Sequence, residues 1–175
     1  RQCQMCIRDS SGGVSAGRLD LVPAQLEAAG VTQVFHKVHV KPGKPVWFGI
    51  GPARDETGSR CSVFGLPGNP VSSMVCFELF VRTALRRLSG RSRSQPEGIT
   101  ARLATAHRAV GDRPTYFPCR YEHDEEGTVA TPVSWQGSSD LRSTVDANAM
   151  ILFPAGDRDF QAGDTIEVFP WASSR

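Results

Sequence analysis

The sequence predicts an α/β fold for residues 11–90, followed by a small all-β, barrel-like domain in residues 99–175. Two observations carry this prediction. In the first part, Gly-rich turns alternate with helix and strand patterns, as in α/β units. In the second part, short β-rich runs are separated by turn residues and no long helical pattern occurs. Between them, residues 91–98 have the Arg, Ser, Pro and Gly composition of a linker.

The first ten residues show neither strand alternation nor a helical stripe. They form an anomalous N-terminal segment, 1–10, for which no element is predicted, and the buried strand expected before a Gly-rich turn is missing there. Residues 11–17 are that turn, and residues 20–29 are a predicted helix that Gly30 ends.

Residues 31–40 are predicted to form a strand whose odd positions share one face. Lys37 and Lys41 then point the same way, about 13 Å apart in a fully extended strand. Residues 46–50 and 61–65 are further predicted strands around a polar turn.

A helix is predicted to start at Asn69, a good N-cap, with Pro70 in the favoured first position. It runs to Leu88, and Gly90 ends it. Its apolar stripe consists of core residues, namely Val71, Met74, Phe77, Val81, Leu85 and Leu88.

The second part contains five β-rich runs, at residues 99–110, 115–123, 128–133, 150–153 and 165–169. Their number and spacing favour a sandwich or a barrel. His107 and His123 fall in these runs and are expected on strand surfaces.

The three lysines of the chain fall within eight residues, at 37, 41 and 44, while the other 17 cationic residues are arginine. Lysine is a compact point charge, so the cluster suits a phosphate or another oxyanion. A solvated strand edge with gatekeeper lysines is the alternative. Residues 1–90 carry 11 basic and 6 acidic residues, and residues 91–175 carry 9 and 12. This balance is too mild for a nucleic-acid-binding protein.

No apolar run approaches the roughly 20 residues of a membrane span, and no signal peptide is recognised. A cytoplasmic protein is therefore expected. The five cysteines are scattered and odd in number, which argues against a disulfide framework. Cys3-x-x-Cys6 has metal-site spacing but lacks a second pair, so it is a weak metal signal.

Two Gly-rich turns, 11–17 and 65–70, each lead towards a predicted helix, where backbone amides bind anions. Neither matches a dinucleotide or phosphate-loop motif, and capped tight turns are the structural alternative. Asp20 is either the N-cap of the first helix or a carboxylate that holds magnesium beside an anion.

The β part offers Arg113, Arg120 and the polar stretch 137–143 as oxyanion-binding groups, against the alternative of a loop with a capped short helix. A hydrolase triad of Ser138, His107 and Asp140 is disfavoured because no serine lies in a GxSxG elbow.

Three stretches together resemble the molybdopterin molybdenumtransferase family, whose animal relative is the E domain of gephyrin. They are Ser11-Gly12-Gly13-Val14-Ser15-x-Gly17-x-x-Asp20, Lys37-x-x-x-Lys41-Pro42-Gly43-Lys44-Pro45 and Gly65-Leu66-Pro67-Gly68-Asn69-Pro70-Val71-Ser72. The resemblance implies a partial molybdopterin-binding (MogA-like) three-layer α/β domain, then a small barrel-like β domain. It also implies a reaction in which adenylylated molybdopterin and molybdate give molybdenum cofactor and AMP, with magnesium.

The resemblance assigns roles to residues. It makes Asp20, Lys37 and Lys41 catalytic, with Asp20 also the metal ligand. The implied substrate-binding residues are Ser11, Gly12, Gly13, Ser15, Lys44, Pro67, Gly68, Asn69, Pro70 and Ser72, with Arg113 or Arg120 and Ser138 or Ser139 from the β part.

Members of this family are more than twice as long and build the site across a homodimer, so the activity of this stretch alone stays open. Two alternatives are molybdopterin adenylyltransferase activity and a non-catalytic scaffold like that of gephyrin. Val14-Ser15 and the β part argue against the first, and the retained lysines argue against the second.

Overall fold

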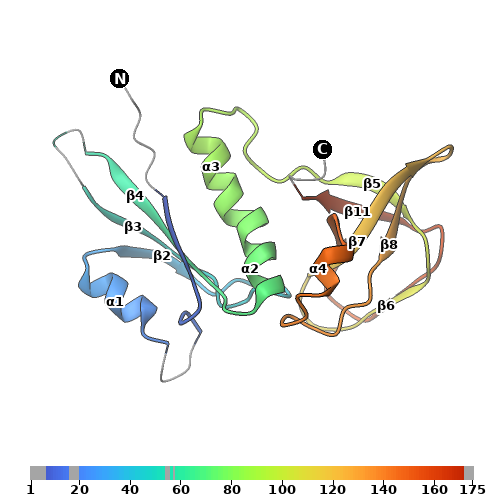
Figure 1. Ribbon diagram of the computed structural model, residues 1–175, viewed down its shortest axis with the longest axis horizontal. Coiled ribbons are helices and arrows are strands. Elements are labelled where there is room, and N and C mark those ends of the chain that lie inside the picture. Colours follow the sequence, from blue (N-terminus) through green and yellow to red (C-terminus); the bar gives the residue numbers. More distant parts are fainter. Residues whose placement is uncertain (1–6, 16–19, 54–55, 57, 172–175) are drawn as a thin grey trace. The chain divides into compact units, whose positions relative to one another are not determined.

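The computed structural model describes residues 7–15, 20–53, 56 and 58–171 (Figure 1). The chain divides into two compact units. The first consists of Arg1–Val38 and Gly43–Gln95, and the second of His39–Pro42 and Pro96–Arg175. Four residues of the lysine-rich stretch therefore group with the β part, although the residues on both sides of them belong to the α/β part.

The first unit is built on a sheet with the order β1-β4-β3-β2. Its strands are β1 (Ile7–Ser11), β2 (Thr32–His36), β3 (Trp47–Ala53) and β4 (Arg60–Leu66). β1 pairs with β4 in parallel, and the other two pairs are antiparallel. The predictions of strands at 46–50 and 61–65 are confirmed by β3 and β4.

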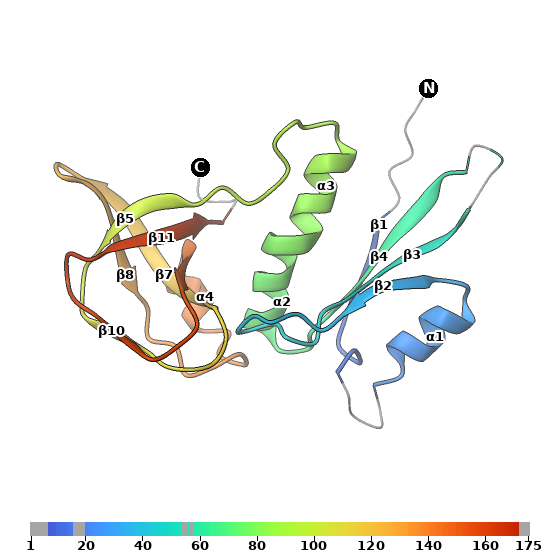
Figure 2. The same cartoon turned by 180° about the vertical axis from the view of Figure 1, so that it is seen from behind.

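Helices cover both faces of this sheet (Figures 1 and 2). α1 (Val22–Ala28) lies on one face, and a continuous helical segment lies on the other. That segment comprises α2 (Pro70–Cys76), the π-helical turn η1 (Phe77–Val81) and α3 (Arg82–Leu88). The predicted helix from 70 to 88 is confirmed, with Asn69 as N-cap and proline in the first turn. Its predicted core stripe is confirmed at Val71 and Val81 but is wrong at Leu85 and Leu88, which are 37% and 40% exposed near the end of the helix.

The core is divided by the sheet into two clusters. On the α1 face, Trp47 and Val63 pack with Val14 and Val31. On the opposite face, Phe64, Leu66, Val46, Cys76 and Val81 pack together. Because successive residues of a strand point to opposite faces, β3 and β4 supply both clusters. The predicted three-layer α/β arrangement is confirmed.

Two predictions for this unit are wrong at the ends of elements. β1 is present although the sequence shows no strand pattern, because its backbone pairs with β4 while four of its five residues stay exposed. α1 is capped by Leu21 and not by Asp20, because proline in the first helical turn fixes the start of the helix.

Replacing Gly65 by alanine is expected to destabilise the first unit by about 1–3 kcal/mol, because a small-to-large change in a packed core forces its neighbours to move. A Cβ at Gly65 would lie 2.6 Å from Val14 Cγ1 and 3.3 Å from Trp47 Cβ. Urea unfolding followed by circular dichroism measures this loss. The matched control is Gly51→Ala on β3, where the new Cβ would make an ordinary contact of 3.5 Å with Cys61. Equal stability of the two variants would contradict the prediction.

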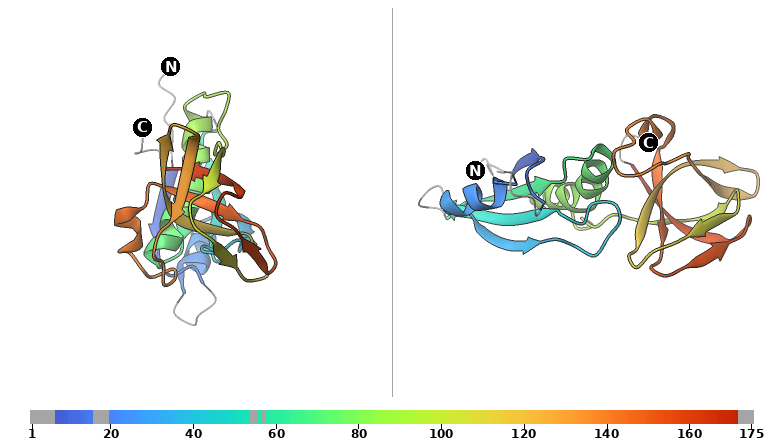
Figure 3. Two further views of the ribbon diagram at one scale, coloured as in Figure 1. Left: turned by 90° about the vertical axis from the view of Figure 1, so that its right-hand side faces the viewer. Right: turned by 90° about the horizontal axis from the view of Figure 1, so that it is seen from below.

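The second unit is a closed barrel with the strand order β11-β5-β8-β7-β9 (Figure 3). The strands are β5 (Ile99–Leu103), β7 (Thr115–Asp124), β8 (Gly127–Pro132), β9 (Ala149–Phe153) and β11 (Thr165–Pro170). The interior is filled by side chains that include Leu103, Cys119, Ile151, Phe153 and Val168. The predicted barrel-like β domain is confirmed.

A separate two-stranded ribbon joins β6 (His107–Ala109) to β10 (Arg158–Phe160). The prediction of one strand over 99–110 is therefore wrong, because the chain leaves the barrel after Leu103 and pairs again with β10. The one helix described in this unit is α4 (Ser143–Asp146). Over the described residues, no helix has both the length and the apolar character that a bilayer crossing requires.

Candidate functional site

The two Gly-rich turns of the first unit lie side by side at the carboxyl ends of neighbouring parallel strands. Ser11 at the end of β1 pairs with Leu66 at the end of β4, and the Gly12 amide donates to the Leu66 carbonyl at 3.0 Å. A Cβ on Gly68 would lie 3.4 Å from the Gly12 Cα. The residues Ser11, Gly12, Gly13, Pro67 and Gly68 are therefore brought together at a sheet edge where α/β folds bind ligands.

Hydroxyl groups tie the two turns to each other. Ser11 Oγ donates to the Pro67 carbonyl at 3.4 Å, and Ser73 Oγ donates to the same carbonyl. Ser73 was missed from the sequence, where Ser72 was chosen instead. Ser72 is 4% exposed on the buried side of α2. Helical phase decides between two adjacent serines, and this phase could have been read from the apolar stripe.

The first turn has a backbone that requires glycine and a firm anchor. Gly12 and Gly13 have φ values of 93° and 70°, in the left-handed region that side chains disfavour. Val14 is buried and its carbonyl is 2.8 Å from His36 Nε2. Ser15 is exposed, as are Gly68 and Asn69 of the second turn, and Pro70 is half-buried. The first turn is therefore anchored by buried Val14, while Ser15 at its outer end faces solvent.

The lysines do not lie on one strand, so the predicted common face of Lys37 and Lys41 is wrong. β2 ends at His36 because Lys37 adopts a φ of 69°. The Lys37 amide donates to Val46, and the Val38 amide donates to Lys44, each at 2.9 Å. Lys37 and Lys44 thus belong to the first unit and flank the base of the loop whose residues 39–42 belong to the second, and both side chains are exposed.

Lys41 belongs to the second unit. Its amide donates to the Pro114 carbonyl at 2.9 Å, and its carbonyl accepts from the Tyr116 amide at 2.7 Å. Arg113 Nη1 donates to the Val40 carbonyl at 3.1 Å. Lys41, which is exposed, and Arg113 therefore share one neighbourhood at the start of β7.

Arg120 lies elsewhere on the barrel. It is exposed on β7, five residues beyond Thr115, and thus about 16 Å further along the strand at 3.3 Å per residue. The geometry favours Arg113 over Arg120 as the arginine that accompanies Lys41.

The polar stretch 137–143 is a loop organised by Asp140. Its carboxylate accepts from the Gln136 amide at 3.1 Å and from the Ser143 amide at 3.4 Å. A loop that leads into the short helix α4 agrees with the structural alternative, although the N-cap residue of α4, Arg142, makes no side-chain cap hydrogen bond. Ser139 is exposed and Ser138 is half-buried in it. Because Asp140 is used to hold the loop, it is not available for a triad.

His107 is half-buried and packs among aromatic rings, so the prediction of a surface position is only partly right. Its ring stacks on Phe153 with centroids 4.4 Å apart and meets the edge of Phe117 at 4.7 Å. Burial lowers the pKa of His107 below its usual value of 6.5. The imidazole is thus kept neutral among aromatic rings.

The stability of the chain is expected to fall as the pH drops below about 6.5 towards the lowered pKa of His107. In this window the unfolded chain binds a proton that the folded chain does not, so stability rises with pH and is fully present above 6.5. Thermal unfolding across this pH range measures the effect. His107→Phe should flatten the dependence, whereas the exposed His123, changed to Gln, should leave it in place. An unchanged profile in His107→Phe would contradict the assignment.

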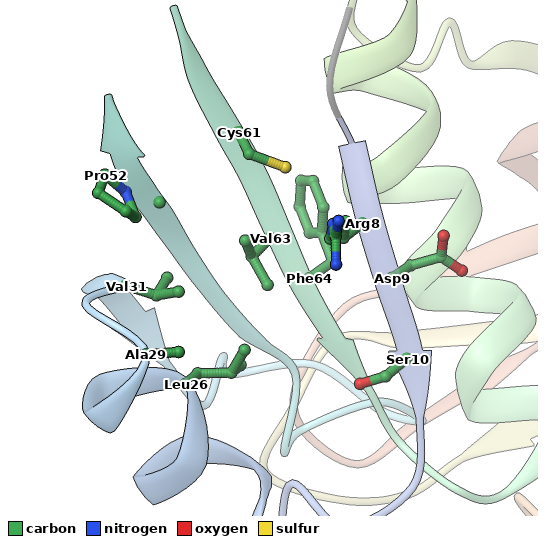
Figure 4. Close-up of a pocket in the computed structure, with 11 residues that line it drawn as sticks. Arg8, Asp9, Ser10, Leu26, Ala29, Val31, Pro52, Cys61, Val63 and Phe64 are labelled. Carbon is green, nitrogen blue, oxygen red and sulfur yellow. The ribbon is translucent and has the colours of Figure 1, made fainter. Parts of the chain in front are cut away.

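A hollow of about 420 Å³ lies beside β1 in the first unit (Figure 4). Figure 4 shows Cys61 and Val63 of β4, together with Leu26 and Val31, around it. None of the residues that line it belongs to the predicted site. The predicted site is therefore an exposed sheet edge and not this apolar hollow.

The metal-ligating side chains of the described residues are scattered. No group of three or more His, Cys, Asp or Glu side chains is placed to hold a metal ion in that part of the chain. Asp20 is half-buried just before α1. Burial raises the pKa of Cys76 and Cys119 to about 12, so both thiols are protonated at neutral pH. Cys3 and Cys6 lie outside the described residues.

The chain combines a mixed sheet, on whose edge two glycine turns meet, with a closed barrel. Each of these two parts matches a known protein family. Residues 10–87 match the family described as a probable molybdopterin binding domain. Residues 100–171 match the C-terminal region, domain IV, of MoeA. The two parts of the chain thus match these two domain families, in the order that the resemblance to the molybdopterin molybdenumtransferases implied.

Individual relatives agree. The chain is 35% identical over 161 residues to the molybdopterin molybdenumtransferase of Bacillus subtilis, covering 91% of this chain and 35% of the relative. It is 34% identical over 175 residues to gephyrin of Dictyostelium discoideum, covering 90% and 24%. The crystal structure of the molybdopterin biosynthesis MoeA protein from Pyrococcus horikosii superposes with a TM-score of 0.70 at 29% identity, covering 93% and 36%. The chain thus spans about a quarter to two-fifths of the length of its curated relatives.

Proposed function

We propose that this chain carries part of an enzyme that inserts molybdenum into adenylylated molybdopterin, giving molybdenum cofactor and AMP. The observation that carries the proposal is the meeting of the turns at 11–15 and 67–69. Their backbone amides and glycines form an anion-binding edge on a chain whose three lysines are all exposed. Relatives named molybdopterin molybdenumtransferase support the reaction.

The proposed roles follow from charge. The turn residues Ser11 to Gly13, with Gly68 and Asn69, hold phosphate oxygens, while Pro67, which has no N–H to donate, shapes the second turn. Lys37 and Lys44 add positive charge in the first unit. Lys41 and Arg113 bind an oxyanion, for which molybdate is the proposed species. Cleavage of a phosphoanhydride link places negative charge on the departing AMP, and such charge is stabilised by cations and oriented donors.

Magnesium is proposed as the assisting metal and Asp20 as a residue that contacts it, because hard cations prefer oxygen ligands and bridge to phosphates. The substrates are proposed to be small molecules. We also propose a cytoplasmic location and a homodimer in the longer protein. Further proposed substrate contacts are Ser15, Asn69 and Pro70, together with either Ser138 or Ser139.

The barrel unit separates this function from the adenylyltransferase alternative, because residues 100–171 match a domain that is named for MoeA. The scaffold alternative draws support from the similarity to gephyrin, but the exposed lysines and the glycine edge favour chemistry.

The test is a chimera in which this chain replaces the matching 161-residue stretch of the Bacillus subtilis relative. The assay follows AMP release from adenylylated molybdopterin with molybdate and magnesium, and the product is scored by activation of an apo-molybdoenzyme. Formation of AMP and active cofactor supports the proposal. A chimera that unfolds cooperatively and keeps the parent's oligomeric state, yet releases no AMP, contradicts it.

A further inference from the structure

His36 is a half-buried residue of the first unit to which the proposed reaction gives no role. It is the last residue of β2 and pairs with Trp47 of β3. Residues directly opposite each other on neighbouring strands point to the same face of a sheet. His36 therefore lies on the face where Trp47 packs with Val14, the buried residue of the first glycine turn.

The ring of His36 binds the main chain of that turn. Its Nε2 atom lies 2.8 Å from the Val14 carbonyl oxygen. A carbonyl oxygen can only accept a hydrogen bond, so Nε2 carries the proton and donates it. The Val14 side chain is 1% exposed. Val14 is therefore fixed at two points, at its side chain by packing and at its carbonyl by His36.

Fixing the Val14 carbonyl also fixes the direction of the next amide. The peptide bond from Val14 to Ser15 is planar and trans, since the cis bond found among the described residues is Lys41–Pro42. In a trans peptide the C=O and N–H bonds point in opposite directions. The carbonyl points towards His36, so the Ser15 N–H points away from it. Ser15 is exposed, and its amide has no main-chain acceptor within the described part of the chain.

The second glycine turn is built in the same way. The Pro67 carbonyl accepts hydrogen bonds from Ser11 Oγ and Ser73 Oγ. The N–H of the next residue, Gly68, then points away from these hydroxyls. Gly68 is exposed, and no described residue offers its amide a main-chain acceptor. In each turn a side chain binds a carbonyl, and the amide that follows is left for a ligand.

An anion is the ligand that suits such amides. Main-chain N–H groups of a turn form concave sites for anions, and their partial charges favour negative oxygens. Lys37, which follows His36 directly, is exposed and adds positive charge to the first unit. Because Nε2 of His36 is already bound to Val14, the ring acts on the anion through the turn.

We propose that His36 is a positioning residue, whose bond to the Val14 carbonyl orients the Ser15 amide as a donor to a tetrahedral oxyanion. The inference rests on the proposed function for the source of this oxyanion, which is a phosphate group of the substrate or molybdate. His36 then sets the affinity of the turn for the anion without touching it.

Inorganic phosphate and molybdate are the two probes, added separately to the whole 175-residue chain in isotope-labelled form. Binding is followed through the amide resonance of Ser15. We expect this resonance to shift with a Kd of about 1 mM, an affinity that a few hydrogen bonds can supply. Binding of either anion supports the proposal, and the tighter of the two identifies the group that the turn holds.

His36→Phe keeps a ring at this position and removes the donor. It should weaken anion binding about threefold to tenfold, the equivalent of one hydrogen bond. His36→Gln should restore the affinity of the parent chain, because its amide nitrogen is as many bonds from Cβ as Nε2 is. His123→Phe is the matched control, since His123 is exposed on β7 in the other unit and should leave the affinity unchanged.

A merely structural role predicts a different pattern. It lowers the melting temperature of His36→Phe and leaves the Kd of the folded chain as in the parent, which would overturn the proposal. In the chimera, His36→Phe should raise KM for adenylylated molybdopterin by the same threefold to tenfold, and His36→Gln should restore it.

Two results on the parent chain alone also overturn the proposal. One is the absence of a Ser15 shift with both anions at about ten times the expected Kd. The other is a nitrogen spectrum in which His36 carries its proton on Nδ1 alone, because such a ring has no donor for Val14. The titrations need no turnover. A chimera that releases no AMP, in which anion binding still depends on His36, would refute the reaction and not this role of His36.

Discussion

Replacing Trp47 by alanine is expected to lower the free energy of unfolding of the first unit by about 3–5 kcal/mol, as for other large aromatic residues removed from a core. Trp47 is 0% exposed and belongs to the cluster that contains Val14 and Val31. Its indole also donates to Gln33 Oε1 at 2.9 Å. The substitution removes both the packing and a partner of Gln33.

The loss should extend to the glycine turn, because Val14 anchors that turn on the same cluster. Amide exchange at Gly12 and Gly13 is expected to accelerate together with exchange in β3. Urea unfolding followed by circular dichroism measures the stability of the whole chain. Val34→Ala is the matched control in the same sheet, since Val34 is 56% exposed and its loss should change stability by about 0.5 kcal/mol or less. If the two variants unfolded at the same urea concentration, the role given to Trp47 would be wrong.

Changing Lys41 to glutamine is expected to slow AMP release by the chimera about 100-fold to 1,000-fold, the range for removing one group that stabilises developing charge. Glutamine keeps much of the side-chain length and removes the ammonium. Lys41→Arg should recover only part of the rate, because a planar guanidinium does not replace a compact ammonium.

Arg91→Gln controls for the loss of one positive charge. Arg91 is exposed in the predicted linker and lies outside the proposed site. Its chimera should release AMP at the parent rate. Steady-state kinetics with varied molybdate separates a loss in kcat from a loss in binding. A Lys41→Gln chimera as active as Arg91→Gln would remove Lys41 from the mechanism.

The sequence predicted those elements whose side chains carry a periodic apolar pattern. The helix from 70 to 88 was predicted from an apolar stripe that runs from Val71 to Leu88. Most barrel strands were predicted from β-rich runs. β1 was not predicted, because it is held by backbone pairing with β4 while four of its five residues are exposed. β10 was not predicted, because three residues are too few to show a period.

Within the candidate site, the sequence indicated the two turns and the lysines, but not how they are arranged. The meeting of Gly12 with Gly68 depends on which strands are neighbours, and local patterns do not encode this. The separation of Lys41 from Lys37 depends on hydrogen bonds to Pro114 and Tyr116, more than 70 residues away. The catalytic and metal roles of Asp20, Lys37 and Lys41 stay predictions.

Because His39–Pro42 belong to the barrel unit, the two units cannot be exchanged between homologues at a single point in the chain. The chain changes unit after Val38, after Pro42 and after Gln95. Recombination within residues 90–98 would therefore join a barrel to residues 39–42 of another homologue. Arg113 and the start of β7 would then have to form their hydrogen bonds with a foreign Val40–Lys41 segment. A barrel grafted without its own four-residue insert would leave the Pro114 carbonyl and the Tyr116 amide without their present partners. The two parts of this protein should thus be exchanged between homologues as a pair, or with residues 39–42 carried along with the barrel.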